Sequence, residues 1–464
     1  MNDFTVILLG VTGDLARRKL IPALYHLIAR KQIKDFIIVG AAYDDTTALA
    51  ILESARELMV GVDDALWKEL EARFFYEQLD FNKEEDFERL STRVTELESQ
   101  FGLSGNRLAY LAAAADFFCP ITKHLAASGI ITRQTPGDRQ WQRIVYEKPF
   151  GHNLESAREI NACIEQLFDE QQIYRIDHFL TKELVSNIAL VRFTNCVFEP
   201  LWNNRFIDQV QIVINEEIAL EGRGAYYDKY GALSDVMQNH VLELLALIGM
   251  ESPEKLSGDY IRDRRVQVLQ KVQVIDGILG QYAGYKDDPS VKKDSDTETF
   301  AALMVRIDNP RWAGVPFYLK TGKCLKKQET KIHIKFKSVD CLLTHDCPVP
   351  SNWLSFEVSP EATFSLSLNA KKPGRGEQVI PVSMEFCHSC LFGAETPESY
   401  EVVIEEVIRG EKSISVRFDE IEQCWRIIDE ARSESFSLSE YECGTNGPEA
   451  LKQFEHKHGM RWRS

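Results

Sequence analysis

The first third of the chain alternates short apolar runs with stretches of helical periodicity, and no other feature limits the fold as strongly. The pattern begins with the apolar run Phe4–Leu9, an amphipathic stretch from Asp14 to Arg30, and the apolar run Phe36–Ala42,. This order predicts a β-α-β opening. Further strands are predicted at Arg107–Ala113, Arg143–Glu147 and Ile173–Ile176, with helices around 84–99, 119–128 and 153–170,. Such alternation is typical of a parallel sheet covered by helices on both faces.

Beyond about Asp177 the rhythm changes to alternating apolar and polar residues, which suits antiparallel strands with one hydrated face,. The clearest predicted strands are Phe206–Ile214, Lys331–Phe336 and Thr363–Leu368, and the clearest helices are Gly231–Met250, Glu398–Arg409 and Asp419–Arg432,. The second region is therefore predicted to be α+β. Because no flexible linker separates the two regions, we expect a substrate cleft at their interface.

The charge balance excludes several classes of partner. Lys and Arg number 54 against 71 Asp and Glu, which gives a formal net charge of -17. Such an acidic surface repels nucleic acid and anionic membranes, so a phosphorylated substrate requires a local basic pocket. The N-terminus has no basic region before its short apolar run, and no stretch approaches the roughly 18 apolar residues of a membrane span. We therefore expect a cytoplasmic protein.

The 10 cysteines are scattered along the chain, so most are expected to be reduced thiols in cores,. Cys387 and Cys390 resemble a metal or redox pair, and Cys341, His345 and Cys347 could complete a zinc site,. Their spacing does not match a familiar zinc module. The sequence therefore predicts no metal.

A glycine-rich loop, Gly10-Val-Thr12-Gly13-Asp14-Leu15-Ala, follows the first predicted strand and opens the first predicted helix. Glycines at these positions let the backbone turn sharply and approach a pyrophosphate, which the helix N-terminus stabilises. A plain strand-to-helix turn would have similar residues. The position at the first β-α junction favours dinucleotide binding.

The end of the second predicted strand, where a dinucleotide-binding sheet contacts the adenosine ribose, carries Tyr43, Asp44 and Asp45. An acid at this place accepts a hydrogen bond from the ribose 2'-hydroxyl of NAD, whereas an Arg pairs with the 2'-phosphate of NADP. No Arg or Lys lies nearby in the sequence, which favours NAD. The two aspartates could equally cap the next helix.

Two later segments carry the remaining polar chemistry. Asp177, His178 and Lys182 lie together at the end of a strand and the start of a helix, which suits a phosphate dianion but also fits a solvated helix start,. His240 lies among apolar positions on the helix Gly231–Met250, opposite a polar face that includes Asp235,. It is either a satisfied core histidine or a general base.

Six ordered blocks of this chain match a known family, and they decide between these alternatives. The blocks are GVTGDLARRKL at 10–20, YEKPFG at 146–151, QIYRIDHFLTKE at 172–183, EGRGAYYD at 221–228, DVMQNH at 235–240 and KPG at 372–374,. With them, the chain is similar to glucose-6-phosphate dehydrogenases from its first strand to about residue 450.

The resemblance implies a fold and a reaction. We expect a Rossmann-like dinucleotide-binding domain over residues 1–176 and a larger α+β domain for substrate binding and dimerisation over residues 177–464, built on an extended, mainly antiparallel sheet. The implied reaction oxidises D-glucose 6-phosphate at C1 to a lactone with hydride transfer to NAD or NADP. The family also implies a homodimer or homotetramer.

The resemblance also assigns roles to individual residues. His240 would be the base that takes the C1 hydroxyl proton, and Asp177 would orient it. The implied substrate contacts are Lys19, Lys148, His178, Lys182, Glu216, Asp235 and Lys323. The implied cofactor contacts are Gly10, Thr12, Gly13, Asp14, Leu15, Tyr43, Asp44 and Lys148.

The chain departs from the family pattern at several of these sites. Phe179 and Thr181 replace a Tyr and a Gly, Ala115 lies where a proline is common, and Tyr43 replaces the Arg of NADP-using relatives. A catalytically silent relative, or a dehydrogenase for a different sugar, would explain such changes. The joint presence of Asp177, His240 and Lys148 favours the active enzyme.

Overall fold

The computed structural model describes residues 3–135, 137–220, 222–339, 349–374, 378–387, 390–391 and 397–463. The chain divides into two compact units. The first comprises residues 1–181, 257–262 and 397–421, and the second comprises residues 182–256, 263–396 and 422–464. The predicted domain division at residue 177 lies near the first change of unit, but it does not include the two later segments of the first unit.

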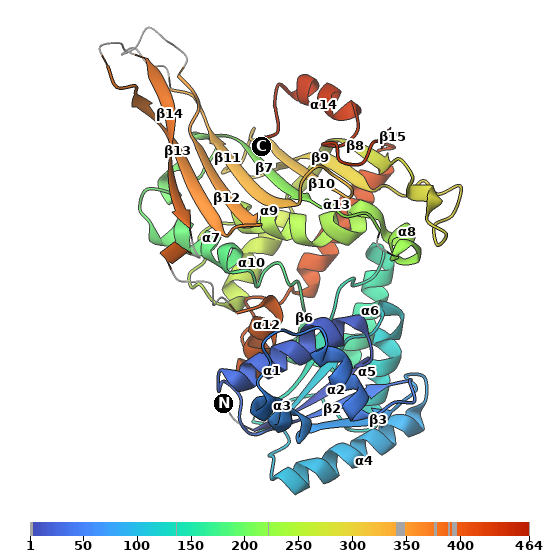
Figure 1. Cartoon of the computed structure of the whole chain (residues 1–464). Coiled ribbons are helices and arrows are strands. Elements are labelled where there is room, and N and C mark those ends of the chain that lie inside the picture. Colours follow the sequence, from blue (N-terminus) through green and yellow to red (C-terminus); the bar gives the residue numbers. More distant parts are fainter. Residues whose placement is uncertain are drawn as a thin grey trace. The chain divides into compact units, whose positions relative to one another are not determined.

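The first unit contains a six-stranded parallel sheet with the order β3-β2-β1-β4-β5-β6 (Figure 1). This is the strand order of a doubly wound dinucleotide-binding sheet. Its strands are β1 (Phe4–Leu9), β2 (Phe36–Ala42), β3 (Phe74–Gln78), β4 (Arg107–Leu111), β5 (Gln142–Tyr146) and β6 (Ile173–Arg175). β1, β2 and β4 are buried along their whole length because helices cover both faces,.

The helices of this unit form two groups. Helix α1 packs with α2, α3 and α12, and helix α5 packs with α4 and α6. The helices are η1 (Ala16–Leu20), α1 (Ile21–Ala29), α2 (Ala48–Arg56), α3 (Asp64–Glu71), α4 (Glu84–Phe101), η2 (Ala115–Phe117), α5 (Phe118–Ala127), α6 (Leu154–Leu167), η3 (Glu170–Gln172) and α12 (Ser399–Arg409). The amphipathic patterns of α4 and α6 predicted them well, since each buries one apolar stripe,.

Helix α12 joins the core of the first unit although it lies more than two hundred residues later in the chain than β6. Val403, Ile404 and Val407 are buried in the same apolar cluster as Leu24 and Leu27 of α1. The buried Glu401 carboxylate is 2.9 Å from His26 Nδ1 and 2.6 Å from Arg30 Nη1. These contacts fix α12 against α1.

The second unit contains a nine-stranded sheet with the order β14-β13-β12-β11-β7-β10-β9-β8-β15. Only the pairs β7-β10 and β8-β15 are parallel among the strands that the structure describes. The strands are β7 (Ile207–Asn215), β8 (Val272–Tyr282), β9 (Phe300–Ile307), β10 (Phe317–Gly322), β11 (Glu329–Phe336), β12 (Trp353–Ser359), β13 (Thr363–Lys371), β14 (Val379–Cys387) and β15 (Leu438–Tyr441).

Helices α7, α9 and α13 lie along one face of this sheet, and α14 lies on the other side (Figure 1). The elements are α7 (Glu183–Thr194), η4 (Glu199–Leu201), α8 (Gly224–Ala232), η5 (Leu233–Val241), α9 (Leu242–Gly249), α10 (Gly258–Leu269), η6 (Tyr285–Asp287), α13 (Phe418–Ser433) and α14 (Ala450–His458). Helix η5 packs directly on β7, β9 and β10. In the described part of the chain, no helix is both long and apolar enough to cross a bilayer.

Candidate active site

The glycine-rich loop turns sharply between β1 and the first helix, as the sequence predicted. Gly10 has φ +90°, and a Cβ at this position would lie 2.5 Å from the carbonyl oxygen of Ala112, at the end of β4. The N–H of Gly13 donates to the carbonyl oxygen of Gly10 at 3.0 Å, and the helix begins at Asp14 and Leu15. A backbone free of side chains at a helix N-terminus fits the pyrophosphate of a dinucleotide.

The loop is joined to the end of β2 by a hydrogen bond between predicted cofactor residues. The hydroxyl of Thr12 donates to the Asp44 carboxylate at 2.6 Å. The Tyr76 hydroxyl donates to the carbonyl oxygens of Ala42, at 3.0 Å, and of Asp44. Burial, and then the charges of Asp44 and Asp45, raise the pKa of Tyr76 to about 12. The edge that would contact the adenosine ribose is therefore electronegative.

The segment after β6 is held in a tight turn that presents Asp177 and His178. The Asp177 carboxylate accepts the N–H of Phe179 at 2.9 Å, and its carbonyl accepts the N–H of Leu180 at 3.1 Å. The hydroxyl of Thr181 donates to the carbonyl of His178 at 2.8 Å. Thr181, a departure from the family pattern, therefore stabilises the turn. Asp177 is buried, and His178 is partly exposed.

Lys148 follows β5 and is adjacent to a buried carboxyl group. The Tyr110 hydroxyl donates to Glu147 Oε1 at 2.5 Å. Burial raises the pKa of Glu147 to about 7, and Asp177 adds to the rise, whereas the Tyr110 hydrogen bond and the Lys148 charge lower it. Glu147 is thus a carboxyl group that changes charge near neutral pH beside two predicted site residues.

Two other predicted lysines lie on or beside helices. Lys19 is on η1, where its ammonium group is 3.2 Å from the carboxylate of Glu398 and both side chains are about half exposed. Lys182 is the N-cap residue of α7, and its carbonyl accepts the N–H of Val185 at 2.8 Å. Asp14, predicted to contact cofactor, forms an exposed ion pair with Arg18 at 2.6 Å.

His240 lies on η5, whose start is fixed by the half-buried Glu298. Gly231, at φ 67°, interrupts the helix, and any side chain there would collide with Glu298. The Glu298 carboxylate then accepts the N–H of Leu233 at 2.9 Å, which satisfies an otherwise unpaired donor of the helix start,. This cap and the packing on the sheet hold His240, which is 3% exposed.

The polar positions of this helix are buried rather than exposed to solvent. Asp235, Gln238 and Glu243 are buried like His240, and η5 packs directly on the sheet. The π-helical winding of η5 also displaces the faces of an ordinary helical wheel,. Glu243 is compensated by Arg265, whose Nη1 is 3.4 Å from its carboxylate.

Residues predicted to contact sugar hydroxyls gather in the second unit. Glu216 and Lys323 form an ion pair and line a cavity of about 170 Å³. Tyr227 lines the same cavity, and its ring centre is 4.9 Å from Lys323 Nζ. Burial, and then the charges of Asp235, Glu298 and Glu216, raise the pKa of Tyr227. Burial, and then the charge of Asp235, raise the pKa of Tyr226 as well. The carboxylate of Glu216, the cations of Lys323 and Arg223 and the phenol of Tyr227 therefore line one small polar cavity.

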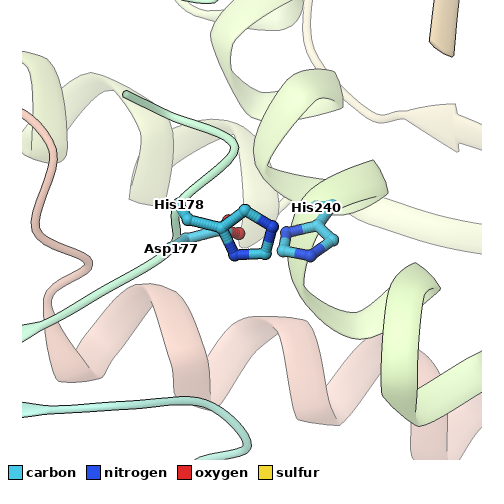
Figure 2. Close-up of side chains that lie close together, drawn as sticks. All are labelled: Asp177, His178 and His240. Carbon is cyan, nitrogen blue, oxygen red and sulfur yellow. The ribbon is translucent and has the colours of Figure 1, made fainter. Parts of the chain in front are cut away.

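Each unit thus assembles part of the predicted site. Figure 2 shows Asp177 and His178 on the segment that follows β6 and His240 on η5. Sequence reasoning missed Glu147, Tyr226 and Tyr227, although all three lie inside the matched blocks YEKPFG and EGRGAYYD. It also missed Tyr400 on α12, for which the sequence carries no local sign.

The expectation of reduced cysteines was wrong for three pairs. Disulfides join Cys119 to Cys163, Cys324 to Cys443, and Cys387 to Cys390. Side chains that are distant in sequence meet between α5 and α6, and again beside Lys323, which spacing alone did not reveal. The last disulfide removes the two thiolates of the zinc site considered above, whose other members, Cys341, His345 and Cys347, lie outside the described residues,.

Comparisons with known proteins agree along the whole chain. Residues 7–187 match the family domain described as "Glucose-6-phosphate dehydrogenase, NAD binding domain", and residues 189–463 match the corresponding C-terminal domain. The chain is 36% identical to glucose-6-phosphate 1-dehydrogenase of Bacillus subtilis, over 98% of this chain and 97% of the relative. It is also 36% identical to glucose-6-phosphate 1-dehydrogenase 2 of Mycobacterium tuberculosis, over 99% and 94% of the two chains.

Solved structures give the same result. A glucose-6-phosphate dehydrogenase in complex with glucose 6-phosphate is similar with a TM-score of 0.90 and 30% identity, over 100% of this chain and 99% of the other. The enzyme of Mycobacterium avium is similar with a TM-score of 0.86 and 33% identity, over 100% and 99% of the two chains. The chain belongs to the glucose-6-phosphate dehydrogenase family.

Proposed function

We propose that this protein oxidises D-glucose 6-phosphate at C1 to 6-phosphoglucono-lactone, the first oxidative step of the pentose phosphate pathway, with hydride transfer to NAD or NADP. The observation that carries the proposal is the full-length similarity to enzymes of this name, one of which was solved with its sugar phosphate substrate. The glycine loop and the polar cavity around Glu216 and Lys323 support it.

In the proposed mechanism His240 takes the proton of the C1 hydroxyl as C1 loses a hydride. The bound nicotinamide supplies the hydride acceptor. Asp177 orients His240 and stabilises the imidazolium that forms, since a carboxylate beside an imidazole favours its protonated state. The buried environment of η5 supports this role, because a base in a fixed position needs no reorganisation during the reaction,.

The remaining predicted residues bind the substrate. We assign the sugar phosphate to His178 and Lys182, with Lys148 between sugar and cofactor and Lys19 nearby. Glu216 and Asp235 would receive the sugar hydroxyls, with Lys323 near the substrate, and the polar cavity that Glu216 and Lys323 line suits this role,. Lys323 already neutralises Glu216. A sugar hydroxyl can therefore bond to this pair without meeting an uncompensated charge.

We infer that the enzyme accepts NAD. Thr12 holds the Asp44 carboxylate at the end of β2, in a place that suits the two ribose hydroxyls of NAD,. A 2'-phosphate there would meet like charge. The Tyr43 side chain is 71% exposed and can pack on the adenine ring instead of pairing with a phosphate,. Steady-state kcat/KM with NAD and NADP tests this preference, and a strong preference for NADP would contradict it.

We also propose that the chain works as a homodimer or homotetramer. An apolar groove of about 530 Å³ in the second unit is lined by Leu201, Phe206, Leu366 and Leu368, among other residues. Met384 of β14 pairs with Leu366 on the neighbouring strand and is 60% exposed. A contiguous apolar surface of this kind is typical of protein contacts. Light scattering of the purified protein tests the assembly, and a monomer at all concentrations would contradict it.

A cytoplasmic location stays a prediction, which cell fractionation tests.

A further inference from the structure

The imidazole of His178 lies close to two aromatic rings of the first unit. The Phe179 ring approaches it edge-on, with ring centres 5.3 Å apart. The Tyr400 ring of α12 is nearly parallel to it, at 16°, with ring centres 6.3 Å apart. Both separations are within the range in which aromatic rings attract each other. The two rings therefore limit the orientations open to His178.

The hydroxyl end of Tyr400 is anchored in turn. Tyr400 is 8% exposed, and its hydroxyl lies close enough to the buried carboxyl group of Glu147 for the two groups to interact electrostatically. The carboxyl group of Glu147 accepts the hydroxyl of Tyr110 at 2.5 Å. Tyr110 belongs to β4 and Glu147 follows β5, so both are fixed by the central sheet. A buried carboxyl group requires such donors, because it has lost its contact with water.

The helix that carries Tyr400 is also fixed. Glu401, the next residue of α12, contacts His26 of α1 and forms an ion pair with Arg30, the residue that follows α1. Arg143 Nη1 donates to the carbonyl of Ile408 at 2.7 Å, near the end of α12. The path from the sheet to His178 therefore consists of hydrogen-bonded or packed side chains on rigid elements.

We propose that Tyr400 is a positioning residue for His178, and that Glu147 and Tyr110 hold Tyr400 in place. The inference rests on the proposed function, since it concerns how His178 is oriented toward the sugar phosphate. It explains why α12 belongs to the first unit: the helix supplies the ring that the loop after β6 lacks. It also gives the buried Glu147 a role that the proton and hydride transfers do not require.

A double-mutant cycle tests the proposal on the full-length protein. Tyr400→Phe keeps the ring but removes the hydroxyl that interacts with Glu147, and we expect it to raise KM for glucose 6-phosphate about fivefold with little change in kcat,. The inhibition constant of inorganic phosphate should rise in parallel, while KM for the dinucleotide stays unchanged. Tyr400→Leu should raise KM for glucose 6-phosphate by a further factor of about two to ten, because it also removes the attraction of an aromatic pair.

The decisive comparison is with His178→Gln. If Tyr400 acts through His178, Tyr400→Phe has no further effect on KM in the His178→Gln protein. An equal rise in both backgrounds, or no rise in the wild-type background, overturns the proposal. Tyr25→Phe is the matched control, because it removes another buried phenol of this unit, one that accepts the N–H of Asp63 at 2.8 Å.

Histidine ring NMR separates this proposal from the proposed function. The signal of His178, assigned by its loss in His178→Gln, should move in Tyr400→Leu and stay in place in Tyr25→Phe, because only the first removes a neighbouring aromatic ring. A wild-type protein that fails to oxidise glucose 6-phosphate but gives this shift contradicts the function and supports the positioning role. An unmoved signal overturns the positioning role whatever the activity.

Discussion

Replacing Glu147 by glutamine tests how burial controls the charge of the site. Glu147 is buried among Tyr110, Tyr400, Lys148 and Asp177. Burial is the largest cause that raises its pKa from 4.5 to about 7. A rise of this size corresponds to about 3 kcal/mol of free energy, since one pKa unit is worth about 1.4 kcal/mol.

The sign of the effect on stability follows from proton binding. Between pH 4.5 and about 7 the folded protein holds a proton on Glu147 that the unfolded chain has lost. The free energy of unfolding therefore falls as the pH rises through this window. Glutamine cannot ionise, so its free energy of unfolding does not fall in this window. As the pH rises from about 4 to about 8, the free energy of unfolding of Glu147→Gln should therefore gain about 3 kcal/mol relative to that of wild type.

Two measurements check this prediction. Infrared difference spectra of wild type minus Glu147→Gln report the protonated carboxyl group directly, and its band should disappear with a midpoint near pH 7. Hydrogen exchange of the β5 amides reports the local free energy of opening at each pH. The exposed Glu165 of α6 supplies the control Glu165→Gln, which should show neither effect. A midpoint close to pH 4.5 for Glu147 would refute the argument from burial.

Four further predictions follow from the site. His240→Asn should lower kcat by about 10²- to 10⁴-fold while dinucleotide affinity stays near wild type, because a general base is lost; unchanged turnover would remove His240 from this role. Lys182→Ala should raise KM for glucose 6-phosphate about 10- to 100-fold, which corresponds to the loss of a charge-assisted hydrogen bond. An unaltered KM would contradict the assignment of Lys182 to the sugar phosphate. Asp44→Asn should lower the ratio of kcat/KM for NAD to that for NADP about fivefold, because one like charge near a 2'-phosphate disappears; a ratio that stays constant would contradict the electrostatic argument. Gly10→Ala should weaken dinucleotide binding and lower thermal stability, since its Cβ would lie 2.5 Å from the carbonyl oxygen of Ala112, and calorimetry showing wild-type values for both would contradict the close approach.

The sheet of the first unit could be predicted well because its strands are continuous apolar runs. Phe4–Leu9 and Phe36–Ala42 have the bounds that the sequence indicated. The edge strand β3 was missed, since Phe74–Gln78 is only five residues long, is mostly half-buried, and mixes aromatic with polar residues. Periodicity detects elements that are buried on a regular face, and an edge strand has no such face.

Candidate site residues could be proposed from the sequence where residues with distinct chemistry occur close together, and their roles stay predictions. The glycine loop and the segment with Asp177 and His178 are of this kind. Tyr400 is not, because its contact with His178 depends on helix α12 returning to the first unit. The π-helix η5, which carries His240, could not be predicted from the sequence either, since a helical wheel assumes 3.6 residues per turn,.

The most direct test of the whole account is the steady-state oxidation of glucose 6-phosphate by the purified protein, with NAD and NADP compared as kcat/KM. We expect turnover that depends on the sugar phosphate and favours NAD. Turnover that strongly favours NADP would contradict the interpretation of Tyr43 and Asp44 and leave the enzyme assignment in place. No turnover with either dinucleotide would contradict the proposal that this protein oxidises glucose 6-phosphate.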